Sequence, residues 1–250
     1  MRNSSSITFF LLLLFASNCS VAQNLSSIED AEKLVWDACL TGESGSIQSA
    51  CVQLASTGGY GADKLEYASN LLSSVEVNGI LFTGSKGDTY PVMMLQYLKG
   101  MRNDIRVIHI DWLKDASYFE RIKATIGIEK KGVAGIRALA KKLPVYVSLA
   151  AGRDLITDMS SKLYCTGLAF KYSEDPLANV KGMQSGWWRN CGKNFMTSGY
   201  SLNANYLIPL AMLASYAKRT DHTEEYEVLR QKYAEVAKSV GESEKIPITK

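Results

Sequence analysis

The chain is poor in the residues from which many active sites are built. Its 250 residues include only two histidines, His109 and His222, so a histidine-rich metal site or a Ser-His-Asp triad has little to draw on. The formal net charge is +3, so basic and acidic residues are nearly balanced. A nucleic-acid partner requires a concentrated basic surface, and this balance does not favour one. The sequence therefore predicts no metal, no cofactor and no nucleic-acid partner.

Long apolar runs are absent beyond the N-terminus. Arg2, the apolar stretch 7–16 and Ser20-Val21-Ala22 follow the order of a secretory signal peptide, which predicts cleavage after residue 22. The run is shorter than the roughly 20 apolar residues that a spanning helix needs. We therefore expect an exported protein, in the periplasm or at the cell surface, with no transmembrane anchor after signal cleavage. Acylation of Cys19 is the minority alternative.

Four cysteines remain after this cleavage: Cys39, Cys51, Cys165 and Cys191. An even number in an oxidising compartment permits disulfides, and Cys39 and Cys51 could bridge two antiparallel helices. Their spacing matches no zinc-binding pattern and no disulfide framework. Buried free thiols are therefore an equally good interpretation.

Hydrophobic periodicity divides the chain into segments. Residues 23–75 carry apolar side chains at helical spacing and predict an N-terminal helical segment. Residues 76–180 predict an α/β domain, and residues 181–241 predict a C-terminal helical segment. Within the last segment, two apolar stripes separated by Thr220-Asp221-His222 indicate an αα-hairpin, a TPR-like pair. Residues 242–250 form a predicted tail.

The middle segment has the pattern of a βαβ unit. Short β-branched or apolar runs at 79–83, 105–110 and 145–149 predict strands, and 91–100 predicts a helix with proline in its first turn. Such an order implies parallel strands with right-handed crossovers. Residues 168–172 predict an edge strand. The expected fold class is α/β, a small parallel Rossmann-like sheet flanked by helices.

The loop that follows the first strand is a candidate anion site. Ligands of open α/β sheets bind outside the carboxyl ends of the strands. Gly84, Lys86 and Thr89 lie in this loop, where backbone N–H groups, a helix N-terminus and a lysine can hold an anion. The glycine spacing matches neither the phosphate-loop pattern nor the dinucleotide-binding pattern. The alternative is that the glycines make the turn while Asp88 or Thr89 caps the helix.

Two carboxylates and an arginine follow the three predicted strands. Asp88 and Asp111 come after the first and second strands, and Arg153 comes after the third. If they converge, the two acids are candidate catalytic residues for general acid-base chemistry, and Arg153 is a candidate ligand for a carboxylate or phosphate. A capping aspartate and a surface arginine are the simpler alternatives. Farther along, Trp187 and Trp188 could stack on a sugar or seal a helix against the core.

A string of residues between Tyr67 and Tyr172 follows a recognisable order. It consists of Asn78, Ile80-Leu81-Phe82-Thr83, Asp88-Thr89-Tyr90-Pro91, Gln96, Gly100, Arg102, Asp104 and Arg106-Val107-Ile108, then Pro144-Val145-Tyr146-Val147 and Gly167-Leu168-Ala169-Phe170-Lys171. In this order it resembles the soluble extracytoplasmic portion of a bacterial family of multi-pass membrane proteins described as protein O-mannosyltransferase-like. Lys86 stands where that family has the first aspartate of its loop.

The resemblance covers less than half of the chain. The family's membrane-embedded part, where a lipid-linked sugar would be handled, has no counterpart here, so the resemblance does not imply a glycosyltransferase. We expect a non-catalytic binding or accessory module of the cell envelope whose partner is an envelope protein or a glycan. The alternatives are an enzyme acting on a small anionic or sugar substrate, and a helical scaffold for a larger envelope assembly.

Overall fold

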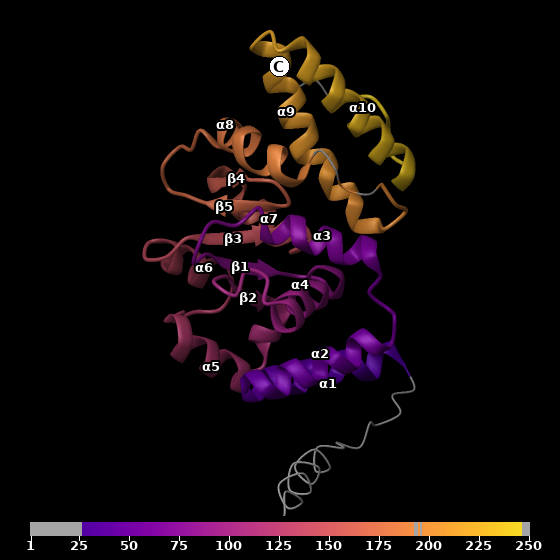
Figure 1. Ribbon diagram of the computed structural model, residues 1–250. Helices are drawn as coiled ribbons and strands as arrows, with labels where there is room; N and C mark the ends of the chain where they lie inside the picture. The colour runs from indigo at the N-terminus through magenta and orange to yellow at the C-terminus, as the bar shows by residue number, and fades with distance from the viewer. Residues whose placement is uncertain (1–26, 193–194, 196, 247–250) are drawn as a thin grey trace, which may run out of the picture.

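The computed structural model describes residues 27–192, 195 and 197–246. The predicted signal peptide, Cys19 and the last four residues lie outside these described residues. The described chain forms a five-stranded sheet with helices on both faces (Figure 1). Short 3₁₀ turns and one π-helical segment, Gln184–Gly192, join the main elements. In chain order these are α1 (Ile28–Thr41), α2 (Ser44–Ser56), α3 (Ala62–Leu72), β1 (Ile80–Thr83), α4 (Lys86–Lys99), β2 (Arg106–His109), α5 (Ala116–Ile126), α6 (Gly132–Ala140), β3 (Val145–Ser148), α7 (Arg153–Met159), β4 (Leu163–Cys165), β5 (Ala169–Tyr172), α8 (Asn179–Met183), α9 (Leu207–Arg219) and α10 (Thr223–Val240).

The sheet is mixed, with the strand order β2-β1-β3-β5-β4. β1 is parallel to β2 and to β3, as predicted, but β5 is antiparallel to both of its neighbours. The prediction that residues 168–172 form an edge strand is wrong, because β4 pairs along their outer side. The physical reason is a tight turn at Gly167, where the Thr166 N–H donates to the Ala169 carbonyl at 2.9 Å. So short a connection reverses the chain and can only join antiparallel strands.

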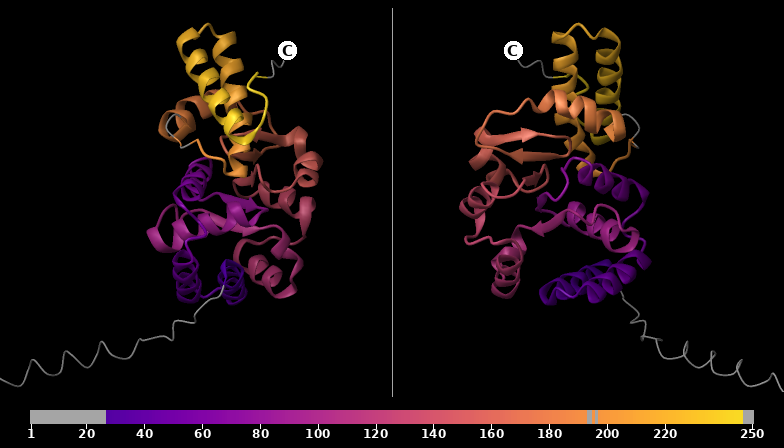
Figure 2. Two further views of the ribbon diagram at one scale, coloured as in Figure 1. Left: turned by 90° about the vertical axis from the view of Figure 1, so that its right-hand side faces the viewer. Right: turned by 60° about the vertical axis from the view of Figure 1, so that its left-hand side comes forward.

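Two hydrophobic clusters lie on opposite faces of the sheet. Ile80 and Phe82 of β1 pack with α1, α2, α5 and α6, whereas Leu81 packs with α3, α9 and α10. This division follows from the strand, whose successive side chains point to opposite faces. Figure 2 shows the α9–α10 pair and the α1–α2 pair at opposite ends of the molecule. The α1–α2 pair and the α9–α10 pair therefore belong to separate hydrophobic cores on opposite faces of the same sheet.

Helix α1 is capped at both ends and buries the apolar face that its sequence pattern predicts. The Ser27 side chain accepts from the Asp30 N–H at the start of α1, and Gly42 ends the helix with φ of +75°. Cys39 and Cys51 lie buried on the inner faces as free thiols, and burial raises the pKa of each to about 12. The suggested Cys39–Cys51 disulfide is therefore not present. Cys165 is also a buried free thiol, and the Cys191 side chain lies outside the described residues.

Helix α4 begins earlier than predicted. Residues 84–88 were expected to form a loop before a helix at Pro91, but the helix starts at Lys86 and Pro91 lies in its second turn. Proline has no N–H, so the carbonyl four residues before it, that of Gly87, loses its helical partner. The Tyr200 hydroxyl donates to this carbonyl at 2.9 Å and replaces the missing bond.

The C-terminal segment forms the predicted helical hairpin. Helices α9 and α10 lie side by side and pack against the same face as α3 (Figure 1). Trp187 and Trp188 are 3% and 0% exposed, so they seal this core and offer no surface for a sugar. Within the predicted tail, Ile246 packs against the cluster. In the part of the chain that the structure describes, no helix combines the length and the apolar character that a membrane span requires.

Candidate functional site

The loops after β1 and β3 meet in direct backbone contact. The chain runs from β1 to β2 and then returns past β1 to β3, so the reversal of strand order lies between β1 and β3. Open α/β sheets bind ligands at such a point. A Cβ atom built on Gly84 would lie 2.5 Å from the Ala151 Cα. The backbone of one loop therefore fills the position where a crevice was expected, and Gly84 serves this close approach.

Substitution of Gly84 by alanine is expected to destabilise the fold by about 1–3 kcal/mol, because the new methyl group must push two strand ends apart. Chemical denaturation would measure the loss. Gly182→Ala is the matched control, since a Cβ built there meets no atom within 4 Å. We expect that control to change stability by less than about 1 kcal/mol. Equal effects of the two substitutions would contradict the close approach.

Asp88 and Thr89 hold the turn between β1 and α4. Asp88 is 0% exposed, and its carboxylate accepts from the backbone N–H groups of Ser85 at 2.9 Å and Gly84 at 3.4 Å. The Ser85 side chain accepts from the Asp88 N–H in return, which completes a capping box. The Thr89 hydroxyl donates to the Ser85 carbonyl at 2.7 Å. The structure thus places both side chains inside the loop rather than at its surface.

Asp111 and Arg153 lie on the surface. The Asp111 side chain is 59% exposed and forms an ion pair with Lys114 at 2.7 Å, which lowers the pKa of the carboxyl group. Arg153 is exposed at the first residue of α7. Asp88 is buried while Asp111 and Arg153 face solvent, so these three residues do not share one enclosed site.

Lys86 also has an internal partner. It forms an ion pair with Glu32 of α1, which is only 6% exposed and also accepts a hydrogen bond of 2.7 Å from the Tyr60 hydroxyl. Sequence reasoning missed Glu32. A signal was present, because Glu32 interrupts the buried stripe formed by Ala31, Val35 and Cys39, and a charged residue on such a stripe needs a partner.

His109 and Trp112 close the carboxyl end of β2. Their rings stack with centroids 4.9 Å apart and planes inclined by 13°. The Asp111 N–H donates to Nδ1 of His109 at 3.2 Å, and burial lowers the pKa of the imidazole below its ordinary value of 6.5. The ring is therefore neutral at pH 7, with its proton on Nε2. The stack forms one end of a cavity.

This cavity has a volume of about 480 Å³ and runs along the outer edge of β2. Helices α2, α4 and α5 and strand β2 contribute most of its walls, and α1 and the turn after β2 contribute one residue each, Cys39 and Trp112. Its size is within the range of small-molecule sites, roughly 300–1,000 Å³. Sequence reasoning missed it, because the lining residues come from segments far apart in the chain. Of the residues proposed from the sequence as catalytic or ligand-binding, only Thr89 lines it.

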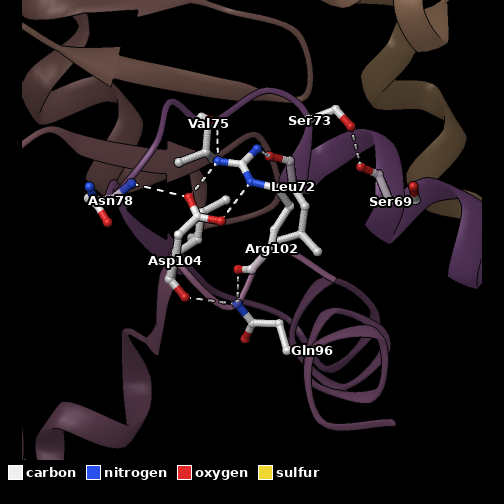
Figure 3. Close-up of polar contacts among 9 residues, drawn as sticks. Ser69, Leu72, Ser73, Val75, Asn78, Gln96, Arg102 and Asp104 are labelled. Atoms are coloured by element: carbon white, nitrogen blue, oxygen red, sulfur yellow. Dashed lines mark hydrogen bonds and ion pairs between the residues drawn. The ribbon is translucent and has the colours of Figure 1, made fainter. Parts of the chain in front are cut away.

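Arg102 is the centre of a hydrogen-bond network at the opposite, amino end of the β1–β2 pair (Figure 3). We call this network, formed by Arg102 and Asp104 with the backbone of Leu72, Val75 and Asn78, the Arg102 lock. The Arg102 guanidinium donates to the Leu72 carbonyl at 2.9 Å, to the Val75 carbonyl at 3.0 Å and to both oxygens of Asp104 at 2.9 Å. Asp104 in turn accepts from the Asn78 N–H at 3.1 Å. These contacts join the end of α3, the start of β1 and the start of β2.

The same lock explains much of the motif between Asn78 and Asp104. The amide of Gln96 donates to the Arg102 and Ile105 carbonyls at 3.0 and 2.8 Å. Asn78, Gly100 and Arg102 have positive φ values, as expected for tight reversals of the chain. These motif residues therefore hold the βαβ unit together. Among the described residues, no three His, Cys, Asp or Glu side chains are grouped as a metal site requires.

The match to a known protein domain falls on this same unit. Residues 64–128 match a family model described as TMEM260-associated domain 2. This segment runs from α3 through β1, α4 and β2 to the end of α5, and it contains the lock, the Asp88 cap and most of the cavity wall. No significant match was found among curated proteins or among solved structures. Over this segment the chain is similar to a TMEM260-associated domain.

Proposed function

We propose that the chain is a non-catalytic binding or accessory module of the bacterial cell envelope, which recognises a glycan or an envelope protein. The observation that carries the proposal is that three candidate groups near the strand ends already have hydrogen-bond or ion-pair partners within the chain. Asp88 caps α4, Lys86 pairs with Glu32, and Asp111 pairs with Lys114. A general acid or base must reach its substrate, and the buried, capping Asp88 cannot, which favours binding over catalysis at this loop.

The match over residues 64–128 supports an accessory role, because the family model is described as a TMEM260-associated domain. The resemblance to an O-mannosyltransferase-like family adds a glycan context, and the predicted signal peptide adds export. The same proposal describes the parallel strands as a Rossmann-like sheet and the α9–α10 hairpin as a TPR-like pair. Together they describe an exported module that works beside a partner.

The proposal is tested by binding of the full-length chain to a glycan array and to proteins extracted from cell envelopes. We expect one glycan or one envelope protein to be retained, and Arg153→Ala to weaken that binding by about fivefold, or about 1 kcal/mol. Arg219→Ala is the matched control, because Arg219 is likewise an exposed arginine but lies at the end of α9.

Two outcomes would overturn the proposal. The first is that no glycan and no envelope protein is retained above background. The second is turnover of a small anionic or sugar substrate that Asp111→Ala abolishes, which would favour the enzyme alternative. If Arg153→Ala and Arg219→Ala weakened binding of the glycan or envelope protein equally, the binding surface would not be at the loops that follow the parallel strands.

A further inference from the structure

The cavity beside β2 has a distinctive set of charges. Its lining includes two arginines, Arg106 from β2 and Arg121 from α5, together with neutral His109. None of the described residues that line it is acidic. Two cations facing one half-open space without a counter-ion leave a positive potential there. An anion would meet no competing carboxylate in this space.

Arg121 is held in place by its surroundings. A Cβ built on Gly42 would lie 2.7 Å from the Arg121 Cδ, so the side chain passes directly beneath the α1–α2 turn. Its guanidinium lies 4.9 Å from the centre of the Tyr118 ring. The Nε atom is buried and has no hydrogen-bond partner among the described residues. A buried donor without an acceptor is costly, and Arg121, which lines the cavity, carries one such unsatisfied N–H group.

Arg106 keeps most of its donors available. One guanidinium nitrogen donates to the Thr125 carbonyl at 2.9 Å, and both residues line the cavity. The remaining N–H groups have no other partner among the described residues. A guanidinium presents its donors as a rigid fork that matches two oxygens of a carboxylate.

Beside the two arginines, eleven of the described lining residues are apolar or aromatic and seven are polar. Met93, Tyr97, Trp112 and Ile122 contribute to the walls. The lining contains no lysine and no glycine-rich turn of the kind that surrounds a phosphate dianion. The combination suits a ligand with one planar anionic group and an apolar body.

We propose that this cavity binds a small organic carboxylate with an aromatic or branched apolar body, its carboxylate held between Arg106 and Arg121. The inference rests on the proposed binding function and names a ligand class for it. The volume of about 480 Å³ is sufficient for one such molecule. His109 and Trp112 then form the wall against which one end of the ligand packs.

The test uses the full-length chain and three probes of similar size: phenylacetate, 2-phenylethanol and phenyl phosphate. Isothermal titration calorimetry reports binding, and the change in the intrinsic fluorescence of the chain's four tryptophans is the second readout. We expect phenylacetate to bind at least about tenfold more tightly than the uncharged alcohol, which corresponds to about 1.4 kcal/mol. Arg106→Gln and Arg121→Gln should each remove most of this preference.

Arg137→Gln is the matched control. Arg137 is an exposed arginine that donates to a backbone carbonyl, that of Asp158, at 2.9 Å, as Arg106 does to Thr125, but it lies outside the cavity. The control should leave phenylacetate binding unchanged. Because Arg106 is also exposed, its variant tests the proposal even if Arg121→Gln impairs folding.

Three results would overturn the inference. They are absence of phenylacetate binding up to about 10 mM, equal affinity for the alcohol, and equal affinity in both cavity variants and the control. Tighter binding of phenyl phosphate than of phenylacetate would also overturn it and would indicate a phosphate ester as the ligand class. The glycan and envelope-protein experiment is independent of these probes, so its failure and the failure of the carboxylate site are distinguishable.

Discussion

Asp88→Ala is expected to lower the free energy of unfolding by about 3 kcal/mol, or the melting temperature by about 10 °C. The carboxylate is fully buried and accepts from the Ser85 and Gly84 N–H groups. Its removal leaves these donors without an acceptor and opens the capping box at the start of α4. Chemical denaturation followed by circular dichroism would measure the change.

Asp111→Ala is the control for this experiment, because both aspartates were candidate acids and only their environments differ. Asp111 is exposed and has a surface ion pair with Lys114, so its loss should cost less than about 0.5 kcal/mol. If the two substitutions were equally mild, the carboxylate of Asp88 would not be the cap described above. An unchanged stability together with lost turnover would instead favour the enzyme alternative.

Arg102→Ala is expected to destabilise the chain by about 3 kcal/mol, because the Leu72 and Val75 carbonyls and the Asp104 carboxylate all lose their donor. Arg102 has φ of +50°, a region in which alanine is strained and glycine is not. Arg102→Gly should therefore be less damaging than Arg102→Ala by about 0.5–1 kcal/mol. Arg137→Ala, with its single bond to a carbonyl, should cost less than about 1 kcal/mol.

The lock also predicts how stability changes with pH. Hydrogen bonds from Arg102 hold the pKa of Asp104 at about 2, below its ordinary value of 3.8. Because the pKa is lower in the folded state, the contribution is complete above the unfolded value and is lost as the pH falls from about 4 towards 2. Urea unfolding at pH 6 and pH 3 should show this loss in the wild type and a smaller one in Arg102→Ala. Equal losses in both would show that Asp104 does not depend on Arg102.

Local patterns in the sequence were sufficient for the helices and the parallel strands. The stripe of Ala31, Leu34, Val35 and Ala38 predicted α1, and the β-branched runs predicted β1, β2 and β3. The start of α4 was missed because Pro91 was assigned to its first turn. Ser85 and Asp88 stand at the spacing of a capping box, and that local signal marks the correct start.

Long-range contacts could not be predicted in the same way. The cavity depends on the distance between α2, α5 and the edge of β2, which no local pattern encodes. The antiparallel β4–β5 pair depends on one turn at Gly167. The motif from Asn78 to Asp104 was conspicuous in the sequence, but its role as a lock became visible only when Leu72 and Val75 were placed beside Arg102.

The two hydrophobic clusters described above separate the C-terminal hairpin from the cavity beside β2. Among the described residues, no buried side chain belongs to both clusters. The α9–α10 pair lies on one cluster, whereas Met93, Ile108 and Ile122 of the cavity wall belong to the other. Coupling between two sites requires an element whose equilibrium both of them bias. Because the two sites contact different clusters, a partner docked on the hairpin and a ligand held beside β2 should bind with nearly additive free energies. Any coupling has to pass through the sheet or through α4, which contributes Val92 to one cluster and Met93 to the other.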